Sequence, residues 1–213
     1  MTMGDNNKAL YAKMIIDQVM APILEKLEKK DISAAQTLRS AFMKADMNLP
    51  GFTYDYLYSI MRKAEIHDKF DMCEVLLRLG GTQDASDLRI NRPEQIFVEL
   101  NRRAIYLKEI LSRIPDQIYD RKNFLETIKE IANAIRFLLD AVNKVINELP
   151  QDTGSKQILE DRKKDFVRNS KKFSNTLKEF FRDTNQNQSV FISADYLIHQ
   201  TNLILRTMKQ ECS

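Results

Sequence analysis

Two short patterns of basic and small residues have the clearest chemical use in this sequence. The first consists of Lys129, Ala132 and Arg136, and the second of Lys171, Ser174 and Lys178. Steps of three and four residues place each set on one face of a helix. Basic side chains attract carboxylates, and a small residue between them leaves room for a partner's side chain. If the two helices are neighbours, they form a peptide-binding groove for an acidic, leucine-rich helix.

The spacing of these residues leaves a second interpretation open. Two basic helices can show the same pattern by chance, and their lysines would then be ordinary solvated side chains. The first pattern runs beside an apolar stripe from Ile128 to Val145, and the second runs beside Val167. Both patterns therefore border an expected core, which is where a groove between two packed helices would lie.

No set of residues has the spacing of a catalytic or metal site. His67 lies in a charged segment and is expected in solvent, and His199 is expected on the outward side of the last helix. Cys73 and Cys212 suggest neither a disulfide framework nor a metal site. Five glycines form no phosphate-binding loop. We therefore expect a protein that is not an enzyme and that uses no metal and no cofactor.

A third basic feature is the run Arg162, Lys163 and Lys164. It lies in residues 155–178, which carry eight basic and three acidic side chains, a local net charge of +5. Such a run is usually a solvated helix face, but it is also the candidate lipid contact of an alternative function, a peripheral protein that binds a phosphoinositide membrane surface. Aromatic residues do not interleave with the lysines, and the whole chain carries only +3, so nucleic acid is not an expected partner.

Helical periodicity runs through almost the whole chain, and no segment alternates as a strand does, so the predicted fold class is all-α. Pro22 predicts a kink or break near Met20–Ala21. Asp31 or Ser33 is expected to cap the second helix, and Thr53 the third.

Later helix ends are predicted from glycine and proline. The fourth helix is expected to stop at Gly80–Gly81, Pro93 is expected as the first residue of the next helix, and Pro115 is expected to end that helix.

The chain is predicted to have two domains. Residues 1–79 would form an N-terminal helical dimerisation domain, residues 80–92 a linker, and residues 93–213 an antiparallel four-helix bundle. The first domain is small and its second helix has an alanine-rich inner face, so its core is modest. We expect it to complete that core with a second copy of the chain.

The N-terminus has no apolar segment typical of a signal peptide, and no segment is long and apolar enough to span a membrane. We expect a cytoplasmic protein.

Four stretches resemble the programmed cell death protein 10 family, also called the cerebral cavernous malformation 3 family. They are "ISAAQTLRSAFMKA", "IPDQIYDRKNFLETIKEIANAIRFLLDAVN", "KKDFVRNSKKFSNTLKEFF" and "SADYLIHQTNLIL". The resemblance runs from about residue 10 to residue 210. It implies an adaptor whose bundle is similar to the focal-adhesion-targeting domain and binds LD-type helices of paxillin, malcavernin and striatin. It also implies a homodimer that exchanges one partner for a group III germinal-centre Ste20-type kinase.

The resemblance also assigns site residues. It implies a dimer interface at Leu38, Ala41, Ile60 and Met61. The family's peptide groove falls on the six residues of the two basic patterns, with Arg136 where the family has a lysine. Family lipid binding would attach to the run from Arg162 to Lys164, with peripheral association with the Golgi or plasma membrane.

Overall fold

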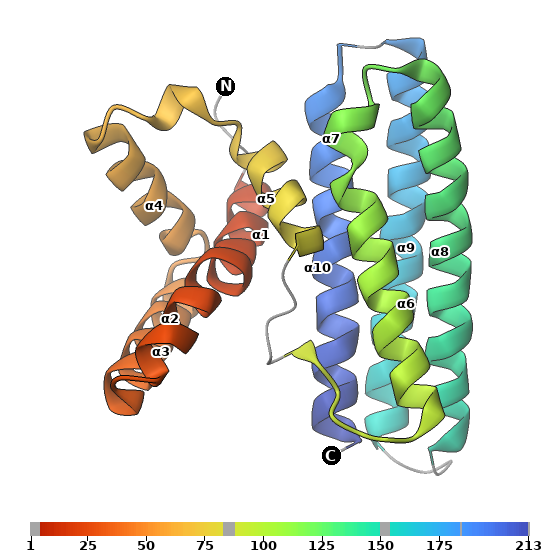
Figure 1. Cartoon of the computed structure of the whole chain (residues 1–213), viewed down its shortest axis with the longest axis horizontal. Coiled ribbons are helices and arrows are strands. Elements are labelled where there is room, and N and C mark those ends of the chain that lie inside the picture. The colour runs from red at the N-terminus through yellow and green to blue at the C-terminus, as the bar shows by residue number, and fades with distance from the viewer. Residues whose placement is uncertain (1–4, 83–87, 150–153, 184, 213) are drawn as a thin grey trace. The chain divides into compact units, whose positions relative to one another are not determined.

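The computed structural model describes residues 5–82, 88–149, 154–183 and 185–212, and these residues form helices and connections without a strand. The chain divides into two compact units between Leu76 and Leu77. Each unit is a set of packed helices (Figure 1). The all-α fold class is thus confirmed.

The N-terminal unit is built from short helices. They are α1 (Asp5–Ile15), a π-helical turn (Ile16–Met20), α2 (Ala21–Glu28), α3 (Ile32–Asn48), α4 (Phe52–Lys63), a 3-10 turn (His67–Lys69) and the start of α5 (Met72–Thr82). Where the sequence predicts a kink or break, the helix instead changes from π to α at Met20–Ala21, because Pro22 has no N–H to donate to the preceding turn.

The two predicted N-caps have different outcomes. Asp31 caps α3, and its side chain accepts a hydrogen bond from the Ala34 N–H at 2.9 Å. The prediction of Thr53 as the next cap was wrong, because Gly51 is the N-cap of α4. Gly51 has φ +96°, a left-handed conformation that glycine adopts without strain.

The N-terminal unit buries few of its large apolar side chains. Ala35 is the one buried residue that α3 contributes over its 17 residues. Large apolar side chains of this unit that remain exposed are Ile23, Ile32, Leu38, Met43, Met47, Leu49, Tyr56, Tyr58, Ile60 and Phe70. Helices without an apolar face packed against a core are marginal in water, so these exposed faces have the character of surfaces that a partner covers.

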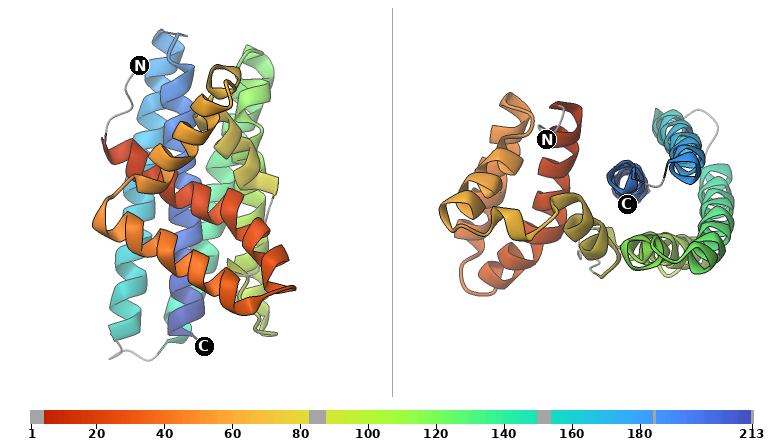
Figure 2. Two further views of the ribbon diagram at one scale, coloured as in Figure 1. Left: turned by 90° about the vertical axis from the view of Figure 1, so that its left-hand side faces the viewer. Right: turned by 90° about the horizontal axis from the view of Figure 1, so that it is seen from above.

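In the described part of the second unit, four long helices and a short one follow the end of α5. They are α6 (Gln95–Ser112), α7 (Ile114–Gln117), α8 (Arg121–Glu148), α9 (Gly154–Arg182) and α10 (Asn187–Glu211). Seen from above in Figure 2, the long helices follow one another round the bundle in the order α6, α8, α9 and α10. Their facing stripes form the core, with Leu100, Leu107, Phe124, Leu138, Phe166, Phe173, Ala194 and Leu205 among the buried residues.

Helix ends in and before the bundle differ slightly from expectation. α5 continues through Gly80 and Gly81 to Thr82, and α6 starts at Gln95, two residues after Pro93. Pro115 lies at the start of α7, just after α6 has ended. Leu88 and Ile90, in the expected linker, are buried. The domain boundaries themselves stay a prediction.

Candidate functional site

The six residues of the two basic patterns lie on α8 and α9, and all six side chains are exposed. These two helices are neighbours in the bundle. They pack less closely against each other than α8 packs against α6 or α9 against α10. A loosely packed pair of helices leaves space along its seam, and the question is which residues border it.

Two sets of contacts define the register of α8 and α9. Near one end the Nζ atom of Lys163 donates to Asn143 Oδ1 at 3.1 Å. Near the other end the ring of Phe124 lies 5.9 Å from that of Phe181. Because the helices run antiparallel, eleven residues back from Asn143 on α8 correspond to eleven residues forward from Lys163 on α9. Ala132 therefore lies level with Ser174.

The same register brings the basic residues into line. Lys129 lies three residues before Ala132, and Lys178 lies four residues after Ser174; in antiparallel helices these are the same direction along the seam, so the two lysines lie nearly level. The two small residues thus share the middle of the seam with a lysine on either side near one end. The residues that sequence spacing singled out therefore come from matching levels of two adjacent helices.

Between these levels the seam has a shallow, mostly apolar lining. The half-buried side chains that line it are Ile128, Ile135 and Leu139 from α8 and Val167 and Ser170 from α9. The hydroxyl of Ser174 donates to the Ser170 carbonyl oxygen at 3.0 Å, and that of Ser170 donates to the Val167 carbonyl oxygen at 2.8 Å. Both hydroxyls are used locally, so this part of the surface presents methylene and methyl groups to solvent.

Arg136 does not take part in the same way as the lysines. Its guanidinium lies 5.0 Å from the centre of the Phe137 ring. The guanidinium of Arg103, which comes from α6, lies 4.6 Å from the same ring. Phe137 is therefore on the α6 side of α8, and Arg136 turns away from Ala132 toward that side. In this conformation the walls beside the seam are Lys129, Lys171 and Lys178.

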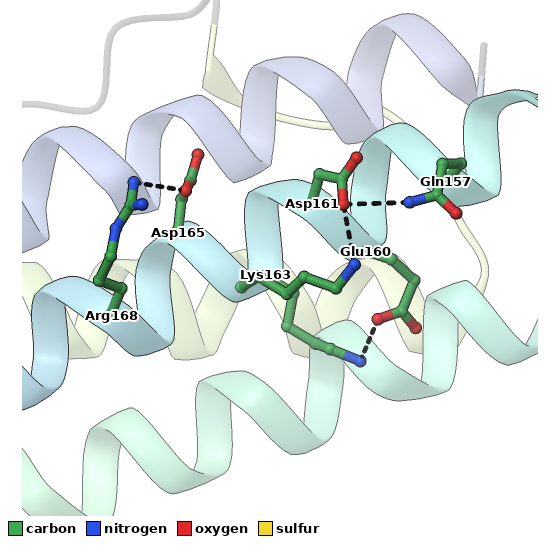
Figure 3. A network of polar contacts seen from close by, with 7 residues as sticks. Gln157, Glu160, Asp161, Lys163, Asp165 and Arg168 are labelled. Carbon is green, nitrogen blue, oxygen red and sulfur yellow. Dashed lines mark hydrogen bonds and ion pairs between the residues drawn. The ribbon is translucent and has the colours of Figure 1, made fainter.

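Ion pairs are unevenly distributed along α9. Its first half pairs internally: Lys163 with Glu160 at 2.6 Å, Lys164 with Asp161 at 3.0 Å and Arg168 with Asp165 at 2.7 Å (Figure 3). The hydrogen bond with Asp161 raises the pKa of Lys164 and lowers that of Asp161. Over the described ranges, no ion pair joins Lys129, Lys171 or Lys178 to a carboxylate. The seam is thus bordered by lysines whose positive charge no described carboxylate compensates.

The residues of the expected dimer interface lie on α3 and α4. Leu38 and Ile60 are each 45% exposed, Ala41 is exposed and Met61 is half-buried. Aromatic rings gather beside them, with the Tyr56 ring 5.6 Å from that of Phe42. Apolar side chains of this size rarely remain exposed in such number on a stable monomeric surface.

Residues with the potential for other chemistry do not converge. His67 is half-buried beside the ring of Tyr58, at 5.8 Å. His199 is buried, so its predicted outward position was wrong. Within the part of the chain that the structure describes, no three His, Cys, Asp or Glu residues gather as metal ligands would. Among the described helices, none is long and apolar enough to cross the bilayer.

Two features of the bundle escaped sequence reasoning. The bond from Lys163 to Asn143 could not be predicted, because the spacing of residues within each helix does not give the register of α9 against α8. The other feature is an open cleft of about 870 Å³ between residues 88–93 and α6. Two hydrogen bonds join Asn101 to this segment. The Ile90 N–H donates to Asn101 Oδ1, and Asn101 Nδ2 donates to the Ile90 carbonyl oxygen.

Comparison with known proteins gives two family matches and one relative. Residues 8–67 match the family described as programmed cell death protein 10, dimerisation domain, and residues 70–160 match programmed cell death protein 10, C-terminal. The chain is 37% identical over 199 residues to the programmed cell death protein 10 homolog of Caenorhabditis elegans, and the alignment covers 90% of each chain.

Proposed function

Because this chain belongs to the programmed cell death protein 10 family, we propose that it is a non-enzymatic adaptor with two binding surfaces. One is the exposed apolar face of the N-terminal dimerisation domain. The other is the seam between α8 and α9, which we name the α8–α9 groove. An adaptor of this kind joins a partner held by one unit to a partner held by the other.

The observation that carries the proposal is the composition of the α8–α9 groove. Its floor has Ala132 and Ser174 at one level, with half-buried aliphatic side chains above and below them. Its walls carry Lys129, Lys171 and Lys178, which form no ion pair with a carboxylate of the described residues. An amphipathic helix with leucines on one face and carboxylates on its flanks complements both features. The family resemblance implies ligands of this kind, the LD-type helices of paxillin, malcavernin and striatin.

The free energies of the expected contacts indicate which of them would determine the affinity for the peptide. Exposed lysine–carboxylate contacts contribute about 0.2–1 kcal/mol each and set orientation and association rate more than affinity. Burial of a leucine side chain contributes about 1.5–3 kcal/mol. A small interface with a few such leucines corresponds to roughly micromolar binding, about −8 kcal/mol.

For the N-terminal unit we propose self-association that competes with a kinase. The exposed faces around Leu38 and Ile60 would be covered either by a second copy or by the C-terminal tail of a group III germinal-centre Ste20-type kinase. Sedimentation with such a tail should show a one-to-one heterodimer that replaces the homodimer. A complex in which the homodimer stays intact would contradict this exchange.

The peripheral-membrane alternative has less support. The basic run at Arg162–Lys164 was its main basis, yet Lys163 and Lys164 are paired with acidic neighbours one turn away on α9. A membrane surface would have to compete with those pairs. Charge reversal of the run should abolish sedimentation with phosphoinositide vesicles and leave peptide binding intact if that alternative is correct.

The test of the groove is a calorimetric titration with an acidic, leucine-rich helical peptide. Lys129→Glu/Lys171→Glu should abolish micromolar binding because it replaces both attractive walls with repulsive ones. The matched control is Lys144→Glu/Lys172→Glu, which changes the same helices by the same charge at exposed positions away from the seam. Equal loss in both double variants, with both still helical by circular dichroism, would contradict a groove at this seam.

A further inference from the structure

The α8–α9 seam is open along the middle of its length and closed at both ends. Ile128, Ile135, Leu139 and Ile146 lie on the same flank of α8, at steps of seven, four and seven residues. The first three are half-buried, whereas Ile146 is only 1% exposed. Since helical position does not distinguish Ile146 from the others, something outside α8 must cover it.

A polar bridge from α9 lies beside this end of α8. The register set by Asn143 and Lys163 places Ile146 level with Glu160. The Lys163 ammonium group contacts Glu160 Oε2 at 2.6 Å and Asn143 Oδ1 at 3.1 Å, so its aliphatic stem crosses from α9 toward α8 at this level. Figure 3 shows Glu160 and Lys163 meeting on one side of α9, while Asp165 and Arg168 meet on another. We name this set the Lys163 bridge.

The opposite end of the seam is closed by aromatic rings. Phe124 lies 5.6 Å from Phe180 and 5.9 Å from Phe181, and the Arg121 guanidinium lies 5.7 Å from the Phe181 ring. Leu125, one residue beyond Phe124, is 42% exposed and marks the start of the open part. From Leu125 to Leu139 the open seam is about 21 Å long, at 1.5 Å per residue, or about four turns of helix.

We propose that the Lys163 bridge is the end of the α8–α9 groove and limits the bound helix to about four turns. The inference rests on the proposed function of that groove. Lys163 is then a specificity-determining residue, because its arm covers Ile146 and stops a longer apolar helix from continuing along α8. The occupant is an acidic, leucine-rich amphipathic helix of about 14 residues.

The test uses three peptides and three proteins. The peptides are a 14-residue acidic helix with leucines at i, i+3, i+4 and i+7, and the same helix extended by seven similar residues at either end. The proteins are the full wild-type chain, Lys163→Ala and the control Lys164→Ala. Lys164 is the control because it is the adjacent lysine on α9. Its side chain is 66% exposed, and among the described carboxylates it pairs with Asp161 alone.

For wild type and Lys164→Ala we expect all three peptides to bind equally. For Lys163→Ala we expect the 14-residue peptide to keep its affinity within about twofold. One extended peptide should gain about tenfold, because its added leucine reaches the uncovered Ile146. The proposed limit on length is wrong if Lys163→Ala binds the extended peptides with the same affinity as wild type. It is also wrong if Lys163→Ala binds the 14-residue peptide more weakly than wild type does.

A second measurement separates this inference from the proposed function. Methyl resonances of Ile146 and Ile135 are recorded with a soluble gadolinium chelate and no peptide. We expect Ile146 to be protected in wild type and as accessible as Ile135 in Lys163→Ala. If the Ile146 methyl groups stay protected from the gadolinium chelate in Lys163→Ala, the Lys163 bridge does not cover Ile146, even if peptides bind. If wild type binds none of the peptides, the proposed function of the α8–α9 groove is refuted. The proposed limit on the length of the bound helix is then refuted with it.

Discussion

Asp46 accepts two hydrogen bonds from Thr53, one from its backbone N–H at 3.1 Å and one from its hydroxyl at 2.6 Å. The last turn of α3 therefore caps the first turn of α4, and Thr53 is buried by this contact rather than serving as the cap itself. The angle between the two helices that carry the expected dimer interface depends on this pair of side chains.

Replacing Asp46 by alanine should destabilise the N-terminal unit by about 1–2 kcal/mol. The variant loses a capping interaction and leaves the buried Thr53 hydroxyl without its acceptor. Urea unfolding at fixed protein concentration measures the change in the free energy of unfolding. The reference variant is Asp31→Ala, which removes an exposed cap and should cost about 1 kcal/mol. A smaller effect for Asp46→Ala than for Asp31→Ala would contradict this prediction.

Replacing Ala132 by phenylalanine should weaken binding of an acidic, leucine-rich helix at least tenfold. The new ring would occupy the floor of the α8–α9 groove, where a leucine of the ligand is expected. Calorimetric titration measures this, with Asn133→Phe as the control because that exposed neighbour lies one helical step farther from the seam. The fold of both variants should be unchanged, since both positions are exposed.

Charged residues on the apolar faces of α3 and α4 should prevent self-association. Leu38→Asp/Ile60→Asp would bury two carboxylates in the interface, which costs far more than the contacts contribute. Analytical ultracentrifugation should show a monomer at concentrations where wild type is a dimer. The control is Val98→Asp in the bundle, because Val98 is exposed to the same degree, 45%. A dimer that persists in the double variant would place the interface elsewhere.

Acid should remove a small stabilising contribution of Glu99. Burial alone would raise its pKa, but hydrogen bonds from Arg102 and Arg103 outweigh this effect and lower it. A lowered pKa in the folded state means that the stabilisation is present above the usual glutamate pKa and is lost as pH falls through the folded value.

The Glu99→Gln variant is therefore expected to be less stable than wild type at pH 7 by under about 1 kcal/mol, because the pairs are partly exposed. The difference should shrink between pH 7 and an acidic pH below the lowered pKa of Glu99. Urea titrations at the two pH values measure it, with Glu109→Gln on the same helix as control. A difference that persists undiminished in acid would mean that the carboxylate charge is not its source.

The features that could be predicted from the sequence depend on interactions between residues close together in the chain. Helices are specified by apolar repeats, caps and prolines within a few residues of one another, so the all-α fold, the Asp31 cap and the change before Pro22 followed from the sequence. Family resemblance, which is also a property of the sequence, indicated the dimerisation domain. Spacing on one helix placed Lys129 with Ala132, and Lys171 with Ser174, on shared faces.

Other features were decided only when the helices packed. Lys163 and Lys164 are identical and adjacent, yet a turn of about 100° directs one across the seam to Asn143 and the other to Asp161. Asp46 reaches Thr53, and Arg136 turns toward Phe137, through contacts that depend on neighbouring turns and helices. The register of α8 against α9, and with it the length of the proposed groove, depends on groups tens of residues apart, which only tertiary packing brings together.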